Sequence, residues 1–547
     1  MESHQNRLLV LLAGFLVLIL YLSDILSVGY YTSADLLGPT SKFPAVFILL
    51  ALTIAVITAY VFLNVSQGKL TISRALILVS PVVLLILYMM LLPDALEKYT
   101  VTNHKDVLSH MARALYVLET GRTDIRVDPY FDMQPGVFYS TAALMLVTGI
   151  DPYLISKWFP LFFVVSIYVP ALVFLGKSFF SSPRELMIFV FLSLVVNWTN
   201  RYHYSAQVYL LPLFAIVVGL LIRGLLDWKR IIVFLLISAA MVVTHQGVTL
   251  FTLAACASIL VFNWVQRLLF GQSKQTGGLL ILTVSLSMMW FLYLGSLTTY
   301  AFADFMVTLG NVAILILTEP FTEIFSNAIA RSNATYQAVV YAKVAFTAVA
   351  YIVGFAILTR AWLRQRVVKM GSLLAIIVGV SSIIYILGFA LGGAAYVERA
   401  VLITGPLLAV ALTLAMSTIR STKSTPVIAL FLIVFTITGT LLFNSNRNFE
   451  SKLYSEDACN IFLTANDPIR IPAYHSIRVT IPRYSYDNVG NAGKIPTGIF
   501  MVQPSYLIES SYWVPQSILT NVTTTLVEKP GVLRFYSNGV CSMYFAT

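Results

Sequence analysis

The chain has 547 residues, of which 58% are hydrophobic and 11% are charged, and its mean hydropathy is +0.84. A composition this apolar excludes an ordinary soluble domain and predicts a helical membrane protein that crosses the bilayer many times. The net charge of +11 does not indicate nucleic-acid binding, because the Lys and Arg residues lie in short clusters between apolar runs, where membrane orientation accounts for them.

Windows of about twenty apolar residues predict about thirteen membrane-spanning helices. They are expected near residues 8–27, 44–63, 74–93, 159–175, 186–198, 207–222, 231–244, 247–265, 278–296, 339–359, 371–390, 400–417 and 426–443. Basic residues gather in every second connection between these spans, and such residues stay on the cytoplasmic side. This predicts a multi-pass protein of the cell membrane with a cytoplasmic N-terminus and an extracytoplasmic C-terminus.

Three segments are expected on the outer side: loops at 94–158 and 297–338, and the C-terminal part of the chain. The predicted domains are therefore a transmembrane domain at 1–443 and an extracytoplasmic domain at 444–547. The second is rich in Ser, Asn, Tyr and Pro and contains the alternating stretches IRVTI and VLRFYSNGVCSMYF. Asn538-Gly539 suits a tight hairpin turn, so we expect a small, mostly β domain.

Two cysteines, Cys459 and Cys541, lie in the predicted outer domain, whereas Cys256 lies alone in a predicted span. On an oxidising face the first two are expected to form a disulfide. Two unpaired thiols are the alternative.

A helix with a polar stripe is expected near the start of the first outer loop, in HKDVLSHMARALYVLE at residues 104–119. Its apolar side chains recur at helical spacing, whereas Asp106, His110 and Arg113 share the opposite stripe. This pattern predicts an amphipathic helix on the outer membrane surface, with its polar stripe facing a cavity that the spans enclose.

These three polar side chains suit acid–base chemistry. A carboxylate such as that of Asp106 accepts a proton from a hydroxyl nucleophile, and a nearby His or Arg positions or balances a charged group. The pattern also has a structural explanation, because the helix dipole favours an Asp near a helix N-terminus and polar pairs are common on solvated helix faces. The sequence leaves both interpretations open.

Further ionisable residues are expected at the outer ends of other spans. Arg201 and His203 lie in NRYHYSAQVY, His245 lies at a tight turn after the seventh span, and Arg399 follows Glu398 beside the twelfth. Individually, His245 can hydrogen-bond within its turn, Arg201 can reach a lipid phosphate, and Arg399 can pair with Glu398. Their coincidence on one face favours a cation-rich pocket that opens outward and binds an anionic headgroup.

In these features the chain resembles the GT-C superfamily of integral membrane glycosyltransferases, which use a polyprenyl-phosphate or polyprenyl-diphosphate sugar donor on the outer face. The resemblance in topology covers the whole chain. Asp106 in HKDVLSHM matches the position of the family's first-loop catalytic aspartate, and three stretches look similar to donor-site segments: YFDMQPGVFYS (130–140), RYHYSAQVYLLP (201–212) and THQGVTLF (244–251). The sequence lacks the Trp-Trp-Asp motif of oligosaccharyltransferases, so a monosaccharide transferase is expected instead.

The resemblance implies an inverting transfer to an acceptor hydroxyl, with Asp106 as the general base. Arg201, His203 and Arg399 would neutralise the leaving phosphate, and His110, Arg113 and His245 would complete the substrate site. Asp128 and Asp132 are weak candidates for a divalent cation, since an Asp beside Pro129 is also a common turn former. No other cofactor is indicated. The expected partners are the lipid-linked donor, a glycan, lipid or protein acceptor, and membrane lipids.

Two other functions use the same features. A transporter or flippase for a lipid-linked or anionic solute would also place cations in a cavity, but transporters commonly contain internal repeats and none is apparent in this sequence. A non-catalytic cell-surface assembly protein would use the C-terminal domain as a binding module. In that case Asp106 would be replaceable.

Overall fold

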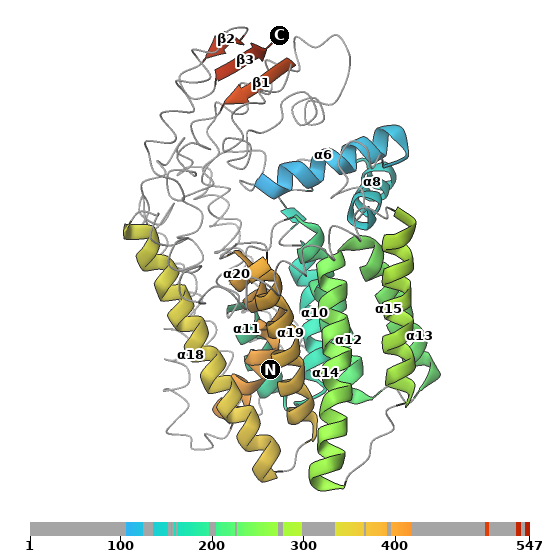
Figure 1. The fold of residues 1–547 in the computed structure, drawn as a ribbon, viewed down its shortest axis with the longest axis vertical. Coiled ribbons are helices and arrows are strands. Elements are labelled where there is room, and N and C mark those ends of the chain that lie inside the picture. The colour runs from blue at the N-terminus through green and yellow to red at the C-terminus, as the bar shows by residue number, and fades with distance from the viewer. Residues whose placement is uncertain are drawn as a thin grey trace, which may run out of the picture.

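The computed structural model describes residues 105–123, 135–150, 155, 158–159, 162–195, 204–224, 227–271, 277–297, 334–365, 368–390, 395–417, 498–502, 532–537 and 542–546. Within these ranges the chain is mostly α-helical (Figure 1). The spans expected near 8–27, 44–63, 74–93 and 426–443 lie outside the described residues. So do IRVTI and the candidate residues Asp128, Asp132, Arg201, His203, Cys459 and Cys541.

Each expected span between residues 159 and 417 coincides with a helix. With the labels of Figure 1, the helices are α6 Lys105–Thr120, α8 Gly136–Thr148, η2 Val164–Tyr168, α10 Val169–Gly176, α11 Pro183–Val195, α12 Ala206–Arg223, α13 Trp228–Thr244, α14 Gln246–Phe270, α15 Gly277–Leu297, α18 Ala334–Gln365, α19 Val368–Ala390 and α20 Ala395–Ser417. Among the described residues, two stretches are long and apolar enough to cross a membrane, Ala206–Arg223 and Gly247–Leu269.

The helices from η2 to α20 form a bundle (Figure 1). α10 continues η2 without a break, and the helices from α10 to α15 run in alternating directions. We call α6 with α8 the cap, because these two helices lie across one end of the bundle. That end is the cap end, and the opposite one is the far end. Short connections between helices, such as 224–227 between α12 and α13, fall at the two ends.

Local signals in the sequence fix where several of these helices begin and end. The Ser205 hydroxyl accepts a hydrogen bond from the Val208 N–H, and the Asp227 carboxylate accepts one from the Lys229 N–H, so each caps the helix that follows. Gly271 ends α14 with φ = 65°, a left-handed conformation that costs a glycine little.

Close contacts between small and large residues hold the bundle helices together. A Cβ added at Gly371 on α19 would collide with the Phe262 ring of α14, and one added at Gly379 would collide with Ser258. Small residues therefore let α14 and α19 approach closely, as is common between helices packed in a membrane.

The polarity of the helix faces is unusual for a bundle in water. Fully buried positions include hydroxyl side chains, which bond back to a carbonyl of their own helix: Ser193 to Phe189, Thr252 to Val248 and Thr413 to Ala409. The outward positions instead carry large apolar side chains, among them Leu236, Val261, Ile281, Met288, Leu292 and Ile352. Such a surface would be costly to expose to water.

Three strands near the C-terminus form an antiparallel sheet in the order β1-β3-β2: β1 Gly498–Val502, β2 Val532–Ser537 and β3 Ser542–Ala546. β2 and β3 pair on either side of Asn538-Gly539, with an irregular register between Arg534 and Tyr536. Figure 1 places the sheet on the cap side of the bundle.

Candidate functional site at the cap end

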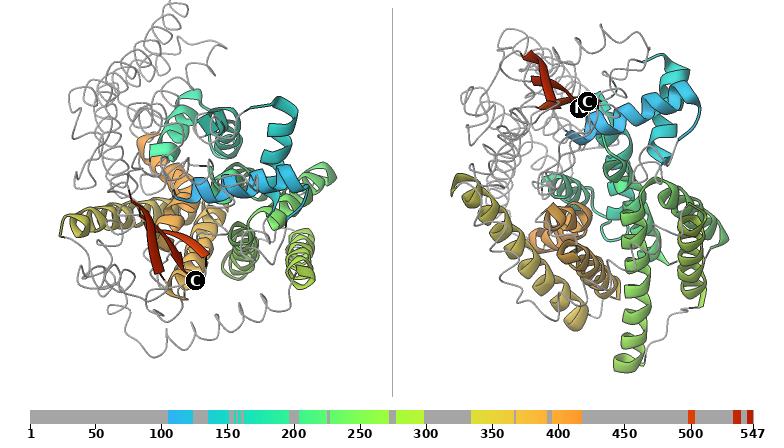
Figure 2. Two further views of the ribbon diagram at one scale, coloured as in Figure 1. Left: turned by 90° about the horizontal axis from the view of Figure 1, so that it is seen from above. Right: turned by 45° about the horizontal axis from the view of Figure 1, so that its top comes forward.

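The cap places the first sequence-predicted site residues directly over the bundle. Figures 1 and 2 show α6 lying across the helix ends, with α8 packed beneath its C-terminal half. Asp106 lies in the first turn of α6, and His110 is one turn further along. The amphipathic helix expected at residues 104–119 is therefore present, and it crosses the end of the bundle.

Two residues of the polar stripe of α6, His110 and Arg113, are buried against the protein. His110 is 8% exposed and Arg113 is 3% exposed, and Met111, Ala114 and Val117 are buried beside them. A cationic side chain as deeply buried as Arg113 is rare unless it meets a partner or a ligand. Both residues thus lie on the side of the helix that faces the protein, whereas the cavity that the sequence pattern places beneath them stays a prediction.

Aromatic rings connect α6 to the bundle. The His110 ring lies 5.7 Å from the Phe138 ring of α8 and 6.3 Å, edge to face, from the ring of Tyr204. Tyr204 in turn meets Phe159 edge to face at 5.2 Å, and Phe159 stacks on Phe163 at 4.7 Å. Edge-to-face and offset contacts of this kind are each favourable.

Tyr204 also ties the bundle to α8 by a hydrogen bond. Its hydroxyl donates to the Thr141 hydroxyl oxygen at 2.7 Å, and both side chains are buried. Burial raises the pKa of Tyr204 far above the ordinary tyrosine value, so the phenol remains a donor throughout the physiological pH range. The contribution of the buried, protonated Tyr204 phenol to the free energy of unfolding is fully present below pH about 10. This contribution is lost as the pH rises above that value.

A second contact joins α8 to the corner between α13 and α14. A Cβ on Gly136 would collide with the Thr244 hydroxyl, so the lack of a side chain at this position lets α8 begin against that corner. His245 follows directly and caps α14, with its Nδ1 accepting a hydrogen bond from the Val248 N–H at 3.3 Å. The local role considered for this histidine is therefore confirmed.

The structure thus brings together parts of three of the sequence stretches singled out for the site, and a fourth contacts them. Residues from α6, from 135–141 and from 204–206 share one buried apolar cluster, and 244–245 meets its edge. Arg399 lies in the first turns of α20, whose N-terminus is also at the cap end (Figure 1). Asp128 and Asp132 are outside the described residues, within which no group of three His, Cys, Asp or Glu side chains is placed to hold a metal ion.

Sequence reasoning missed Phe138, Thr141 and Tyr204 as individual residues. Two of them lie within stretches that were singled out for their aromatic content, YFDMQPGVFYS and RYHYSAQVYLLP. Thr141 gave no signal, because a single threonine in an apolar run is common and its partner is 63 residues away.

Tyr204→Phe is expected to lower the free energy of unfolding of the cap by about 1–2 kcal/mol, because the variant removes the donor to Thr141 while keeping the ring contacts. Faster amide hydrogen exchange in α6 and α8 would reveal this loss of stability. Tyr139→Phe is the matched control, since Tyr139 is exposed on the same helix as Thr141. Equal exchange in both variants would show that the hydrogen bond contributes nothing.

No family model matches this sequence, and no curated protein matches it either.

Proposed function

We propose that this protein is a multi-pass membrane glycosyltransferase that moves a sugar from a polyprenyl-phosphate or polyprenyl-diphosphate donor to an acceptor hydroxyl at the cap end. The observation that most favours this function is the contact between α6 and Tyr204. Asp106 lies in the first turn of α6, and Tyr204 follows Arg201 and His203 in the sequence. The helix that carries the proposed base therefore contacts the residue that follows the proposed phosphate-binding cations in the sequence.

Membrane insertion is supported by the reversed polarity of the helices. Large apolar side chains point outward along α13, α14, α15 and α18, whereas hydroxyl groups are turned inward and satisfied within their helices. In a bilayer this arrangement buries the apolar surface in lipid, and the inward hydroxyls of Thr252 and Thr413 bond to carbonyls of their own helices. The spans expected outside the described residues would bring the total to about thirteen.

Orientation is supported by the distribution of charge. The far end of the bundle holds Arg223, Arg230, Arg267, Arg364 and Lys369, among other basic residues, at the ends of helices and beside their connections. Because such residues stay in the cytoplasm, the cap end and the C-terminal domain would lie outside, where lipid-linked sugar donors are used. The disulfide between Cys459 and Cys541 belongs to the same proposal.

The proposed reaction needs one base and one set of cations. The acceptor oxygen forms a bond to the anomeric carbon while the bond from that carbon to the donor phosphate oxygen breaks, which inverts the configuration. The acceptor proton passes to the Asp106 carboxylate. The phosphate departs with the bonding electron pair, and Arg201, His203 and Arg399 stabilise the growing negative charge.

His110 and Arg113 would bind the substrate from the inner face of α6, because their side chains face the protein and not the solvent. His245 has a capping role and would shape the site through the α13–α14 corner that α8 contacts. Asp128 and Asp132 remain candidates for orienting the sugar or for binding a divalent cation.

The purified protein in lipid nanodiscs should transfer radiolabelled sugar from a polyprenyl-phosphate donor to an acceptor fraction prepared from membranes. The corresponding nucleotide sugar is the matched donor control and should give no transfer, because the proposed donor is lipid-linked. Movement of the labelled lipid across a vesicle bilayer without transfer would instead support a flippase. Neither transfer nor movement, with correctly folded protein, would favour the assembly function.

A further inference from the structure

The far end of the bundle carries most of the basic residues of the described helices. Within the described part of the chain, they lie on helices that adjoin the connections at that end: Lys177, Arg184, Arg223, Lys229, Arg230, Arg267, Arg360, Arg364 and Lys369. Within the described residues, the acidic side chains there are Glu185 and Asp227, and Asp227 accepts the hydrogen bond that caps α13. The far end is therefore strongly positive.

Several of these cations are held in place by neutral oxygens. Arg223 donates to the Phe174 carbonyl at 2.7 Å and to the Ser178 hydroxyl at 2.9 Å, and its guanidinium lies 4.1 Å from the Phe174 ring. Lys369 donates to the Ser178 carbonyl at 3.0 Å, and Arg230 donates to the Gly224 carbonyl at 3.1 Å. These bonds order the cations at the end of the bundle without cancelling their charge.

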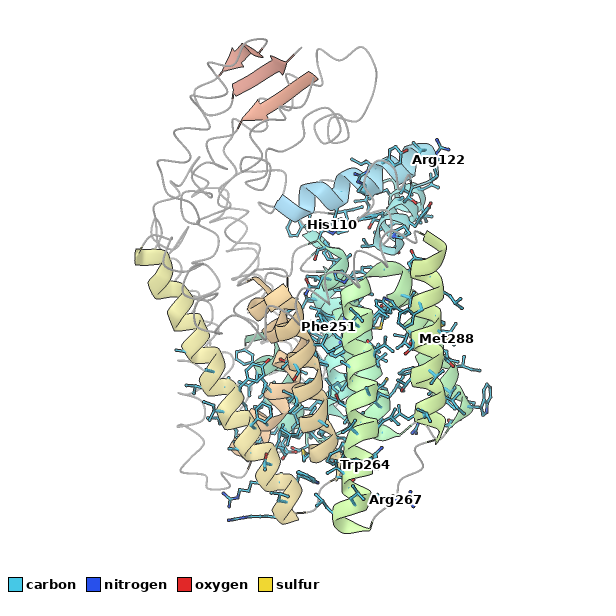
Figure 3. The ribbon with its side chains drawn as sticks, in the orientation of Figure 1. His110, Arg122, Phe251, Trp264, Arg267 and Met288 are labelled. Atoms are coloured by element: carbon cyan, nitrogen blue, oxygen red, sulfur yellow. The ribbon has the colours of Figure 1, made fainter. Side chains whose placement is uncertain are left out.

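Exposed tryptophans accompany the cations at the same level. Trp228, in the first turn of α13, is 66% exposed and lies beside Lys229, whose Nζ is 5.9 Å from the centre of its ring. Trp264 is 62% exposed one turn before Arg267 on α14, and Figure 3 shows both near the far end. Leu268 and Leu269 are exposed next to Arg267.

This combination matches the boundary between lipid headgroups and acyl chains. Indole rings favour that boundary, and Lys and Arg side chains extend their apolar stems along it while placing their charge among the phosphates. A soluble polyanion would neutralise the cations but would leave Trp228, Trp264 and the leucines in water. The apolar side chains beside the cations therefore select a membrane lipid as the partner.

We propose that the far end is a binding surface for anionic phospholipid headgroups, with Lys229 and Arg267 among its contacts. This inference rests on the membrane insertion given under Proposed function, but it does not depend on sugar transfer. Each cation near an anionic membrane surface strengthens binding by about fivefold at low salt.

The test compares binding of phosphatidylglycerol and phosphatidylcholine to the purified full-length protein, measured by native mass spectrometry at low salt. Wild type should bind phosphatidylglycerol more tightly. Arg267→Gln should weaken that binding by about fivefold and leave phosphatidylcholine binding unchanged. Arg122→Gln is the matched control, because Arg122 is also an exposed arginine but lies at the cap end (Figure 3), so it should have no effect.

Three outcomes would overturn the proposal. Equal binding of the two lipids by wild type would show that the surface does not recognise headgroup charge. An equal effect of Arg122→Gln would assign the preference to net charge and not to the far end. Displacement of phosphatidylglycerol by soluble glycerol phosphate would identify the ligand as a free anion. A preference for phosphatidylglycerol in protein that transfers no sugar would refute the transferase alone.

Discussion

Asp106→Asn is expected to lower the rate of sugar transfer by roughly 10²- to 10⁴-fold, because asparagine keeps the size of the side chain but cannot take the acceptor proton. Asp106 lies in the first turn of α6, one turn from His110, which packs against the bundle through Tyr204. The substitution leaves those contacts in place. Transfer of radiolabel from a polyprenyl-phosphate sugar, in nanodiscs with matched amounts of protein, measures the effect.

Glu119→Gln provides the control for Asp106→Asn, since Glu119 lies near the other end of the same helix. It should transfer sugar at the wild-type rate. Asp106→Glu, which restores a carboxylate on a longer side chain, should recover part of the activity. Equal labelling by wild type and Asp106→Asn would remove Asp106 as the base and leave it as a residue favoured by the helix dipole.

Phe138→Ala is expected to destabilise the cap by about 3–5 kcal/mol, the usual cost of removing a fully buried phenylalanine ring. The ring packs in a cluster with Met111, Val117 and Met145 and meets the His110 ring. This cluster is separate from the main core of the bundle, and the partly buried Phe159 and Tyr209 contact both. The loss should therefore be local, with α6 and α8 opening while the bundle stays folded.

Hydrogen exchange followed by mass spectrometry separates local from global opening in Phe138→Ala. Peptides from α6 and α8 should exchange much faster, whereas peptides from α14 and α19 should not change. Leu146→Ala is the matched control, because Leu146 is 77% exposed on the same helix. Faster exchange throughout the bundle would show that cap and bundle unfold as one unit. Sugar transfer should fall along with protection of α6.

The positions of the bundle helices could be predicted because each is a long apolar run bounded by polar residues. The expected spans at 207–222 and 247–265 correspond to α12 and α14. Each helix is slightly longer than its expected span, because it begins and ends at its capping residues. The span expected at 159–175 contains a π-helical turn at Val164–Tyr168, which no pattern in its apolar residues indicated. Hydrophobicity specified the helix but not this internal irregularity.

The helix α8 was not predicted because its apolar residues have no single face. Val137, Phe138 and Met145 are buried, whereas Leu144, Leu146 and Val147 on the same 13 residues are exposed. A clear helical periodicity appears only when one face is apolar and the other is polar. In α6 the polar stripe is distinct, so the helix and the inward position of His110 and Arg113 could be inferred. The contacts of Tyr204 with Thr141 and His110 depend on tertiary packing and had no local signal.

The separation of the cap cluster from the bundle core bears on how such a protein changes over evolutionary time. Substitutions at Met111, Ala114, Ala142 and Met145 are limited mainly by the other side chains of this set, because these residues pack together in the cap. The shared rings of Phe159 and Tyr209 are constrained from both sides. The side chains of the cap can therefore change with little effect on the bundle core, provided that the two bridging rings and the Tyr204 contact are retained.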